Sequence, residues 1–395
     1  MCDTLCARRA EGTVFGKNSD RPPSEVQLIE SHAARHGGGS LRTQYLTIDD
    51  PGAAALIGAR PDWLWGMEHG INHHGVAIGN ERVFTDDDPD QHPPGLIGMD
   101  LVRLGLERGT TAHRAVAEIT ALIQRHGQGG VADPVTGDAY FSSFLVADPH
   151  EAWVVESSGR DWAAHTVTDH AAISIRITLT TCTQASTDDP DRFDPQAWLR
   201  PDEWTAHADQ RLAASRGALA TSVDFGPSDM AAALRDHGGH RWGAPGADLP
   251  TVDPPTDQGP DGQGWTVCMH VRGLSTTTSS IIGWLDRSGN HRAWVAPGSP
   301  CVSVFIPLSA TQPAPTLLAD PDAWRRLARL RDLVDADPAL LPEIRAHLDP
   351  LEGRLWDEAD GLAEAGADGA NWSRFSTRAC QEADAAITSL LDQSG

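Results

Sequence analysis

The chain has 395 residues, of which 40% are hydrophobic, and 55 acidic against 31 basic side chains give it a formal net charge of -24 at pH 7. Its size and apolar content predict a globular protein with a sizeable core. The charge disfavours partners such as nucleic acid or an anionic membrane, whose phosphates would repel the chain, and no apolar run approaches the roughly 18 residues of a membrane span.

The first 95 residues favour β-structure, because short runs rich in β-branched and aromatic residues alternate with glycine, proline and aspartate. These runs cover residues 12–16, 25–31, 41–49, 53–59 and 75–84. Two helices are expected next, one over 98–109 and one that begins at Thr110 or Thr111 as N-cap and ends at Gly127. This part of the chain predicts a helical hairpin lying on a sheet.

Further strands are expected after the hairpin, in an antiparallel meander and then in a third β block. The meander covers 139–148, 151–158, 161–167 and 171–179, and the third block covers 264–271, 276–286, 291–297 and 301–306. Between them, helical pieces near 203–216 and 228–237 precede a segment rich in proline, glycine and aspartate at 239–263, which is typical of a surface loop or lid. From about residue 319 the pattern is helical.

This order of strands and helices predicts an α+β fold and argues against a doubly wound parallel sheet. Neither GxGxxG nor GxxxxGK[ST] follows any of the expected strands, so dinucleotide and P-loop nucleotide binding lack their usual sequence support. No cofactor is expected. The six cysteines show no disulfide framework and no zinc spacing, which indicates reduced thiols and a cytoplasmic protein.

The second residue, Cys2, carries the first chemical signal. Removal of Met1 would leave a thiol beside a free α-amine, whose ordinary pKa of about 7.7 to 8 makes it a base near neutral pH. One residue would then supply both nucleophile and base. The alternative is a small buried residue at the start of a strand. No charged region or apolar stretch precedes Cys2, so it is not expected to carry a lipid.

The segment FGKNSDR places Lys17, the only lysine of the chain, close to Asp20. A cation near a thiol lowers the pKa of that thiol, and a carboxylate can hold an α-ammonium or orient the nucleophile. A charged hairpin turn is the simpler explanation of the same residues. The segment therefore supports a reactive Cys2 without establishing it.

Taken together, ordered segments of the chain resemble the secernin and bacterial dipeptidase family of N-terminal-nucleophile hydrolases. The segments are CDTLCA, GTVFGKNSDR, PDWLWGMEHGINHHGVAIGNERVF, GMDLVRLGLERG, HGQGG, SSFLVADPHEAWVVESSGRDWAA, TVCMHV and PCVSVF. The resemblance covers residues 2 to about 306 and implies a four-layer αββα sandwich of antiparallel sheets. It implies a domain over 2–310 with a helical extension over 311–395 packed on it.

The resemblance also implies site residues. Cys2 would be the attacking thiol, Asp20 its carboxylate partner and Lys17 a nearby cation, with Asn80 as an oxyanion-hole side chain. Three further residues of the same block would line the substrate cleft: Trp65, Asn72 and Glu81. One position departs from the family, since Ile175 stands where an asparagine is usual. Either Arg176 substitutes for that asparagine, or the site differs in substrate or efficiency.

Two histidine-containing patterns have weaker interpretations. Cys268 and His270 would share one face of a strand and could form a thiol–imidazole pair, but a half-buried strand near the cleft that brings His270 to the substrate is favoured. His69, His73 and His74 lack an accompanying carboxylate pattern, so no metal site is expected there. The acidic run at 86–90 is expected to be a solvated loop, with calcium binding left open.

The sequence therefore predicts a cysteine amidase or dipeptidase that cleaves an amide or peptide bond of a small substrate through an acyl-enzyme on Cys2. Two alternatives stay open: an amide hydrolase or acyltransferase dedicated to one pathway in specialised metabolism, and a family member that binds without catalysis. The expected partner is a small peptide or acyl-amide, without nucleic acid or membrane. The oligomeric state, a homo-oligomer included, is left open.

Overall fold

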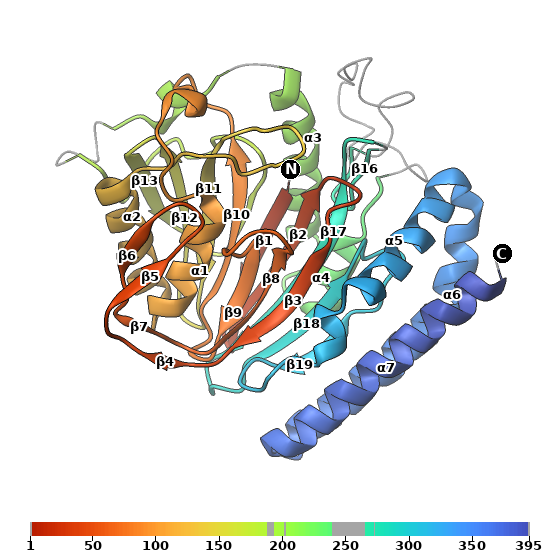
Figure 1. The fold of residues 1–395 in the computed structure, drawn as a ribbon. Helices are drawn as coiled ribbons and strands as arrows, with labels where there is room; N and C mark the ends of the chain where they lie inside the picture. The colour runs from red at the N-terminus through yellow and green to blue at the C-terminus, as the bar shows by residue number, and fades with distance from the viewer. Residues whose placement is uncertain (1, 188–192, 201–202, 239–264, 272, 394–395) are drawn as a thin grey trace.

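Two large antiparallel sheets face each other in the computed structural model, which describes residues 2–187, 193–200, 203–238, 265–271 and 273–393 (Figure 1). Among these residues the first sheet has seven strands. Their order is β14 (His170–Ile173), β1 (Cys2–Arg8), β2 (Gly12–Arg21), β17 (Ser275–Asp286), β18 (Arg292–Pro297) and β19 (Ile306–Ser309), and β16 (His270–Val271) pairs with β17. The N-terminal strand thus lies inside a sheet.

The second sheet has eight strands in the described part of the chain. Their order is β15 (Gln184–Ala185), β13 (Asp161–Thr166), β12 (Ala152–Ser158), β11 (Phe141–Ala147), β10 (Ala77–Val83), β9 (His69–Asn72), β8 (Leu56–Pro61) and β3 (Gln27–His32). Two small hairpin-like pairs lie outside both sheets: β4 (Arg35–His36) with β7 (Gly52–Ala53), and β5 (Ser40–Arg42) with β6 (Thr47–Asp49).

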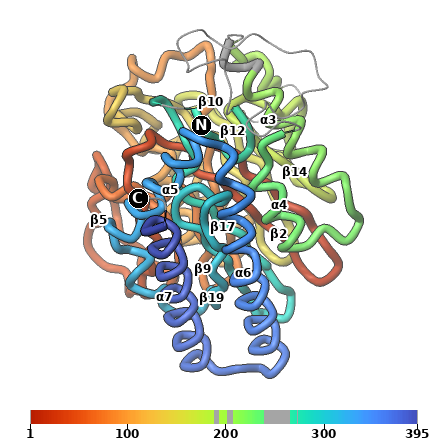
Figure 2. The backbone as a smooth tube through the Cα atoms, turned by 90° about the vertical axis from the view of Figure 1, so that its right-hand side faces the viewer, coloured from red at the N-terminus to blue at the C-terminus, as the bar shows by residue number. Residues whose placement is uncertain are grey.

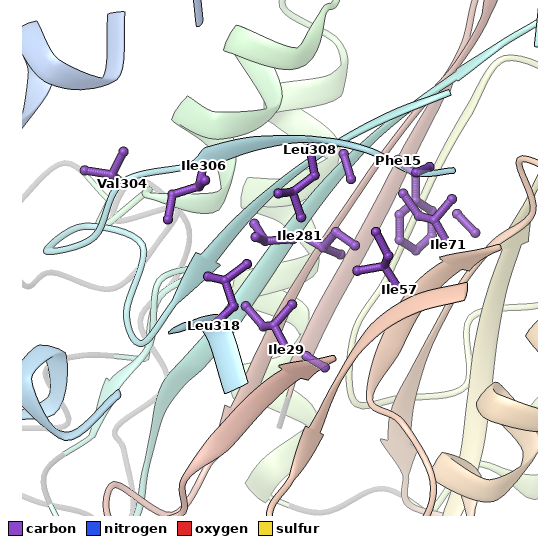
Figure 3. Close-up of a cluster of buried hydrophobic side chains, with 14 of the residues drawn as sticks. Phe15, Ile29, Ile57, Ile71, Ile281, Val304, Ile306, Leu308 and Leu318 are labelled. Atoms are coloured by element: carbon purple, nitrogen blue, oxygen red, sulfur yellow. The ribbon is translucent and has the colours of Figure 1, made fainter. Parts of the chain in front are cut away.

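The inner faces of the two sheets meet in an apolar core. Phe15 of β2 and Ile281 of β17 come from the first sheet, and Ile57 of β8 and Ile71 of β9 come from the second (Figure 3). All four side chains are almost completely removed from water. Burial of such side chains stabilises the fold by about 1.5 to 3 kcal/mol each, so this layer holds the sandwich together.

Helices cover the outer faces of both sheets. On the second sheet, α1 (Gly98–Arg108) contacts β9 and β10, and α2 (Ala112–His126) contacts β12 and β13. On the first sheet, α3 (Glu203–Leu219) contacts β1 and β14, and α4 (Pro227–Leu234) contacts β2 and β17. The predicted four-layer αββα sandwich of antiparallel sheets is therefore confirmed.

The ends of α2 agree with the sequence signals. Thr111 is its N-cap, and the Thr111 hydroxyl accepts a hydrogen bond from the backbone N–H of Arg114 at 3.2 Å. Gly127 follows the last turn with φ of 72°, a left-handed conformation that glycine adopts without steric cost. The helical hairpin expected from the sequence is thus present.

Three helices follow the last strand: α5 (Pro321–Ala336), α6 (Leu341–Glu364) and α7 (Gly369–Gln393). The second and third contact β19, and the first contacts β3 (Figure 2). Their apolar side chains belong to the same buried cluster as the inner faces of the sheets. They therefore pack on the sandwich as an extension, and the division at residue 310 stays a prediction. None of the helices that the structure describes combines the length and apolar character of a membrane span.

Several expected strands are shorter than the sequence suggested. The strand His170–Ile173 covers only the first three residues of 171–179, only His270–Val271 is extended among the described residues of 264–271, and only Ile306 is extended within 301–306. Short apolar runs do not distinguish strands from buried turns, because both are shielded from water. Residues 265–269 and 301–305 form such buried turns. The loop expected at 239–263 lies outside the described residues, and so does residue 264, the first residue of an expected strand.

The sheets approach each other closely at Gly79 of β10. A Cβ atom at this position would lie 2.6 Å from the Cδ atom of Lys17 and 3.0 Å from the Oγ1 atom of Thr4. Both neighbours are fully buried. We predict that Gly79→Ala lowers the free energy of unfolding by about 1 to 3 kcal/mol, as measured by urea denaturation.

The matched control is Gly217→Ala in α3, where an added Cβ would meet no described atom within 4 Å. In this helical position alanine should raise the free energy of unfolding, by up to about 1 kcal/mol. Equal effects of the two substitutions would contradict the close approach at Gly79.

Candidate active site

Cys2 is the first residue of β1, between β14 and β2 in the interior of its sheet. It is paired with Ser19, and its side chain is buried. The Sγ atom accepts a hydrogen bond from the backbone N–H of Asp20 at 3.4 Å. The carbonyl oxygen of Cys2 accepts one from the Ser174 hydroxyl, also at 3.4 Å. Cys2 is therefore held from β2 through its sulfur and from the residue after β14 through its carbonyl oxygen.

Burial raises the pKa of the Cys2 thiol to about 12, although the nearby Lys17 ammonium lowers it. The carboxylates of Glu81 and Glu68 raise it further. The thiol is thus protonated at neutral pH. A reaction that uses it as a nucleophile needs a base to remove its proton.

A cavity of about 250 Å³ opens beside Cys2. Its walls come from both sheets and from the segment before β11. The lining residues are Cys2, Asp20, Arg21, Pro22, Glu68, Asn80, Arg82, Phe84, Asp133, Thr136, Asp138, Tyr140, Leu274 and Ser275. Charged groups of both signs therefore surround a space of the size of a small molecule.

Lys17 places a buried ammonium between the two sheets. Its Nζ atom donates hydrogen bonds to the carbonyl oxygens of Glu68, at 2.7 Å, and Asn80, at 2.5 Å. A carboxylate oxygen of Glu68 lies 3.5 Å away. Burial opposes the charge, but the Cys2 thiolate and the carboxylates of Glu68 and Glu81 raise the pKa of Lys17 above its ordinary value. The side chain is therefore a cation that joins β2 to the opposite sheet.

Asp20 follows on the same strand, and its carboxylate is held from two sides. Thr277 of β17 donates its hydroxyl to Oδ1 at 2.7 Å, and Arg211 of α3 contacts Oδ2. The same guanidinium contacts the carboxylate of Asp3. Burial raises the pKa of Asp3 to about 7 and raises that of Asp20, while Arg211 lowers both. One buried arginine thus balances two buried carboxylates close to Cys2.

Two side-chain donors of the cavity converge on the sulfur of Met99. The amide nitrogen of Asn80 lies 3.6 Å from its Sδ atom, and the hydroxyl of Tyr140 lies 3.4 Å from the same atom. A thioether is a weak acceptor. Lys17 faces the Oδ1 atom of Asn80 at 3.3 Å, so the amide nitrogen of Asn80 is oriented away from the cation. Both donors can therefore serve a stronger acceptor that enters the cavity.

The charged residues of the cavity wall are themselves paired. Arg21 makes two hydrogen bonds to the carboxylate of Glu25, at 2.6 and 3.1 Å, and donates another to the Tyr140 hydroxyl at 3.1 Å. Arg82 pairs with Asp138 at 2.9 Å and lies over the ring of Tyr140. The second pair is partly exposed, so it can exchange partners with a bound substrate.

The remaining residues predicted for the cleft lie elsewhere. Glu81 is buried under Cys2, where it accepts a hydrogen bond from Thr4, and burial raises its pKa to about 8. Asn72 donates to the carbonyl oxygens of Leu106 and Gly109, at 2.8 and 2.7 Å. These two hydrogen bonds join β9 to the end of α1, so Asn72 has a structural role.

Trp65, Arg176 and His270 are also absent from the described wall of the cavity. Trp65 lies under the guanidinium of Arg103, and Arg176 pairs with Asp209 of α3. His270 faces Cys268, with its Nε2 atom 3.4 Å from Sγ. The expectation that Arg176 replaces the missing asparagine finds no support in this arrangement, because its guanidinium is engaged with α3.

Ile175 is fully buried and cannot donate a hydrogen bond. The residue before it, Ser174, instead fixes the backbone of Cys2. Among the described residues of the cavity, Tyr140 offers a neutral hydroxyl, since burial raises its pKa well above the ordinary value. Tyr140 thus adds a donor that the sequence patterns did not indicate.

Sequence reasoning missed Tyr140, Glu68 and Arg211. Glu68 lies within the block that carries the resemblance, but only its neighbour His69 belonged to a pattern with a chemical interpretation. His69 faces the Ser19 hydroxyl at 3.5 Å, whereas His73 accepts from the backbone of Ala55. No sequence pattern indicated Arg211. It lies 191 residues after Asp20, and an arginine in a helix is ordinarily a surface residue.

No family model matches the chain. Several solved structures follow a similar path at low identity. The penicillin V acylase of Agrobacterium tumefaciens is 11% identical, with a TM-score of 0.42 over 78% of this chain and 86% of that one. A Caenorhabditis elegans ortholog of N-acylethanolamine-hydrolyzing acid amidase is 10% identical, with a TM-score of 0.39 over 71% and 92%.

The C2A mutant of conjugated bile acid hydrolase from Clostridium perfringens is 9% identical, with a TM-score of 0.41 over 75% of this chain and 89% of that one. At these values the comparisons carry neither a family nor a substrate over to this chain. The relationship to secernins and bacterial dipeptidases stays a prediction.

Removal of the Arg211 charge should destabilise the protein in a pH-dependent way. Arg211→Met leaves Asp3 and Asp20 buried without their cation, which should cost about 3 to 5 kcal/mol of unfolding free energy at pH 8. Because Arg211 lowers the pKa values of both carboxylates, its loss raises them in the folded state. The deficit should therefore be smallest near pH 5 and grow as pH rises through about 7.

Urea denaturation of both proteins at several pH values measures this deficit. Arg216→Met, an exposed position of the same helix, is the control and should change the free energy of unfolding by less than about 0.5 kcal/mol. A deficit for Arg211→Met that does not vary with pH would contradict the role of the two carboxylates.

Proposed function

We propose that the protein is a cysteine amidase of the N-terminal-nucleophile type, which cleaves a C–N amide bond of a small substrate. The observation that carries the proposal is the position of Cys2. Its thiol lies at a cavity that also contains Asp20 and Asn80, and a buried ammonium stands nearby on Lys17. A cysteine that served only as packing would not need these polar neighbours.

The reaction begins after removal of Met1, which frees the α-amine of Cys2. The thiol proton passes to this amine as sulfur attacks the carbonyl carbon of the substrate. The amine then gives the proton to the leaving nitrogen, and the C–N bond breaks to leave a thioester on Cys2. Water attacks the thioester, which releases the acid and restores the thiol. The raised pKa of the thiol explains why a base this close is needed.

Lys17 and Asp20 position the nucleophile and balance its charge. The Lys17 ammonium favours the thiolate that forms during attack, because it lowers the thiol pKa. The backbone N–H of Asp20 donates to the sulfur, and the negative charge of the Asp20 carboxylate favours the α-ammonium that forms when the amine accepts the proton.

Asn80 and Tyr140 supply the donors for the oxyanion. Both side chains point at the Met99 sulfur, a poor acceptor, so neither gives up a strong hydrogen bond when the substrate enters. A negatively charged oxygen is a far better acceptor than a thioether, and donors fixed before the reaction stabilise the transition state. In this proposal the Tyr140 hydroxyl donates the hydrogen bond that the family supplies from an asparagine at the position of Ile175.

The cavity favours a small substrate with charges of both signs, such as a dipeptide. The Arg82 guanidinium can bind a terminal carboxylate, and Asp133 and Asp138 can bind an α-ammonium. A long acyl chain would bring apolar surface against these charged groups. A second candidate, an amide hydrolase or acyltransferase for one pathway intermediate, is favoured by Ile175, which changes the family pattern beside the nucleophile.

The decisive experiment assays the protein against free dipeptides, the same dipeptides with an acetylated amine, and fatty acyl amides. We expect free dipeptides to be preferred and Met1 to be absent from the intact mass of the active protein. Cys2→Ala should reduce turnover at least about a thousandfold, as loss of a nucleophile does in other hydrolases. An amide-based electrophile should label one site in the original protein and none in this variant.

Cys6→Ala is the matched control, since Cys6 is a buried cysteine of the same strand that belongs to the core between the sheets. It should retain turnover. Retained Met1 in an active protein, or unchanged turnover of Cys2→Ala, would contradict the mechanism. Absence of both turnover and labelling would favour a protein that binds without catalysis, and preference for acyl amides would favour the dedicated hydrolase.

The oxyanion role of Tyr140 has its own test. Tyr140→Phe removes one donor while the ring stays, so kcat should fall by roughly a hundredfold with little change in KM. Tyr45 is the other of the two tyrosines, and its hydroxyl donates to the carbonyl of Val131. Steady-state kinetics of Tyr45→Phe should match the original protein. Equal kcat values for the two variants would exclude Tyr140 from the oxyanion site.

A further inference from the structure

A second cluster of reactive side chains lies outside the cavity of Cys2. Two cysteines and two histidines meet there: His237, Cys268, His270 and Cys301. One ligand atom from each residue lies within 4.8 Å of the other three. Both sulfurs are buried, as is His270, whereas His237 is half-buried. The proposed amidase mechanism uses none of these four residues.

His270 is oriented toward the two sulfurs. Its Nε2 atom lies 3.4 Å from the Sγ atom of Cys268 and 3.3 Å from that of Cys301. Its other nitrogen, Nδ1, lies 2.8 Å from the carboxylate of Asp335 in α5. When Nδ1–H donates a hydrogen bond to this carboxylate, the Nε2 lone pair is directed at the cluster. This arrangement is the one that metal-binding histidines share with their supporting carboxylates.

The distances agree with tetrahedral coordination of zinc. With Zn–S bonds of about 2.3 Å and Zn–N bonds of about 2.0 to 2.1 Å, a tetrahedron places sulfur and nitrogen about 3.6 Å apart. The two sulfur–nitrogen distances of His270 are close to this value. Two thiolates with two imidazoles also form one of the common structural zinc sites, and their soft and borderline donors disfavour calcium and magnesium.

The backbone segments that carry the ligands are held together by other bonds. The N–H of Cys268 donates to the carbonyl of Asp236, next to His237, at 3.1 Å. Arg235 donates to the carbonyl of Pro300, next to Cys301, at 2.8 Å. The ligand positions therefore do not depend on one flexible side chain, and the cluster is organised before any ion binds.

We infer that these four residues form a structural zinc site, with Asp335 as the carboxylate that orients His270. Binding converts the two thiols to thiolates and releases their two protons to solvent, so the charge of Zn²⁺ is balanced. All four positions are protein ligands, which leaves no open position for substrate. The ion would join the end of α4, the start of β16, the turn after β18 and helix α5 (Figure 1).

The site would also support the amidase residues at a distance. The backbone N–H of Met269, which lies between two of the ligands, donates a hydrogen bond to the Oγ1 atom of Thr277 in β17 at 2.9 Å. The same hydroxyl donates to the carboxylate of Asp20. Zinc would therefore fix the backbone that positions Thr277, without touching the reacting atoms.

The test uses the full chain, purified under reducing conditions without a histidine tag and incubated with Zn²⁺ before removal of unbound metal. Mass spectrometry of the metal content should give about one zinc per chain. Co²⁺ in place of zinc should give the visible bands of tetrahedral cobalt and a thiolate charge-transfer band. Cys268→Ser and Cys301→Ser should each lose most of the zinc and the charge-transfer intensity.

Cys380→Ser is the matched control, because Cys380 is equally buried but lies in α7, outside the cluster. It should keep about one zinc per chain. If the cluster variants do not fold, Asp335→Asn keeps all four ligands and should weaken zinc affinity roughly 10-fold or more in a chelator competition. Titration of the folded original protein with a mercurial should release its zinc as Cys268 and Cys301 react.

Three results would overturn the inference: a chain still free of zinc after the incubation, zinc retained in full by folded Cys268→Ser, or a disulfide between Cys268 and Cys301 in the reduced preparation. The proposed amidase is tested separately. Cys2→Ala should bind zinc like the original protein while it loses turnover, so the failure of one proposal leaves the other unaffected.

Discussion

The ammonium of Lys17 is the charge around which the two sheets are arranged. Lys17 belongs to β2 of the first sheet. Its ammonium donates hydrogen bonds to the carbonyl oxygen of Glu68, just before β9, and to that of Asn80 in β10 of the second sheet. A charge buried this deeply is stable only when hydrogen bonds and counter-charges replace water. The sheets must therefore meet closely at this point, and Gly79 permits the approach.

The same requirement explains why so many polar side chains lie inside the sandwich. The carboxylates of Asp3 and Asp20 share one guanidinium, and Thr277 of β17 donates its hydroxyl to Asp20. Each partner is buried, so removal of one leaves another without compensation. Cys2 thus stands in a region whose polar groups interact with one another, as the proposed catalysis requires.

The resemblance found in the sequence involves strands of both sheets, and the structure changes its details. Asn80 reaches the cavity as expected, whereas Asn72 serves the framework and Arg176 pairs with α3. In the proposed mechanism Tyr140, which comes from the segment before β11, supplies the donor that Ile175 cannot. The two proposals concern different parts of the molecule, linked through Thr277.

The sequence by itself determined an α+β order of elements, both ends of α2 and the neighbourhood of Cys2, because those features depend on local periodicity, caps and residues close together in the chain, whereas the αββα layers were implied by the resemblance. Only the tertiary structure brought Arg211 to Asp20, Tyr140 to Met99, and His237 and Cys301 to the pair formed by Cys268 and His270. These contacts join residues far apart in sequence, and no local spacing encodes them. The turn around Cys301 resembled a strand in the sequence because its residues are buried, and buried turns are as apolar as buried strands.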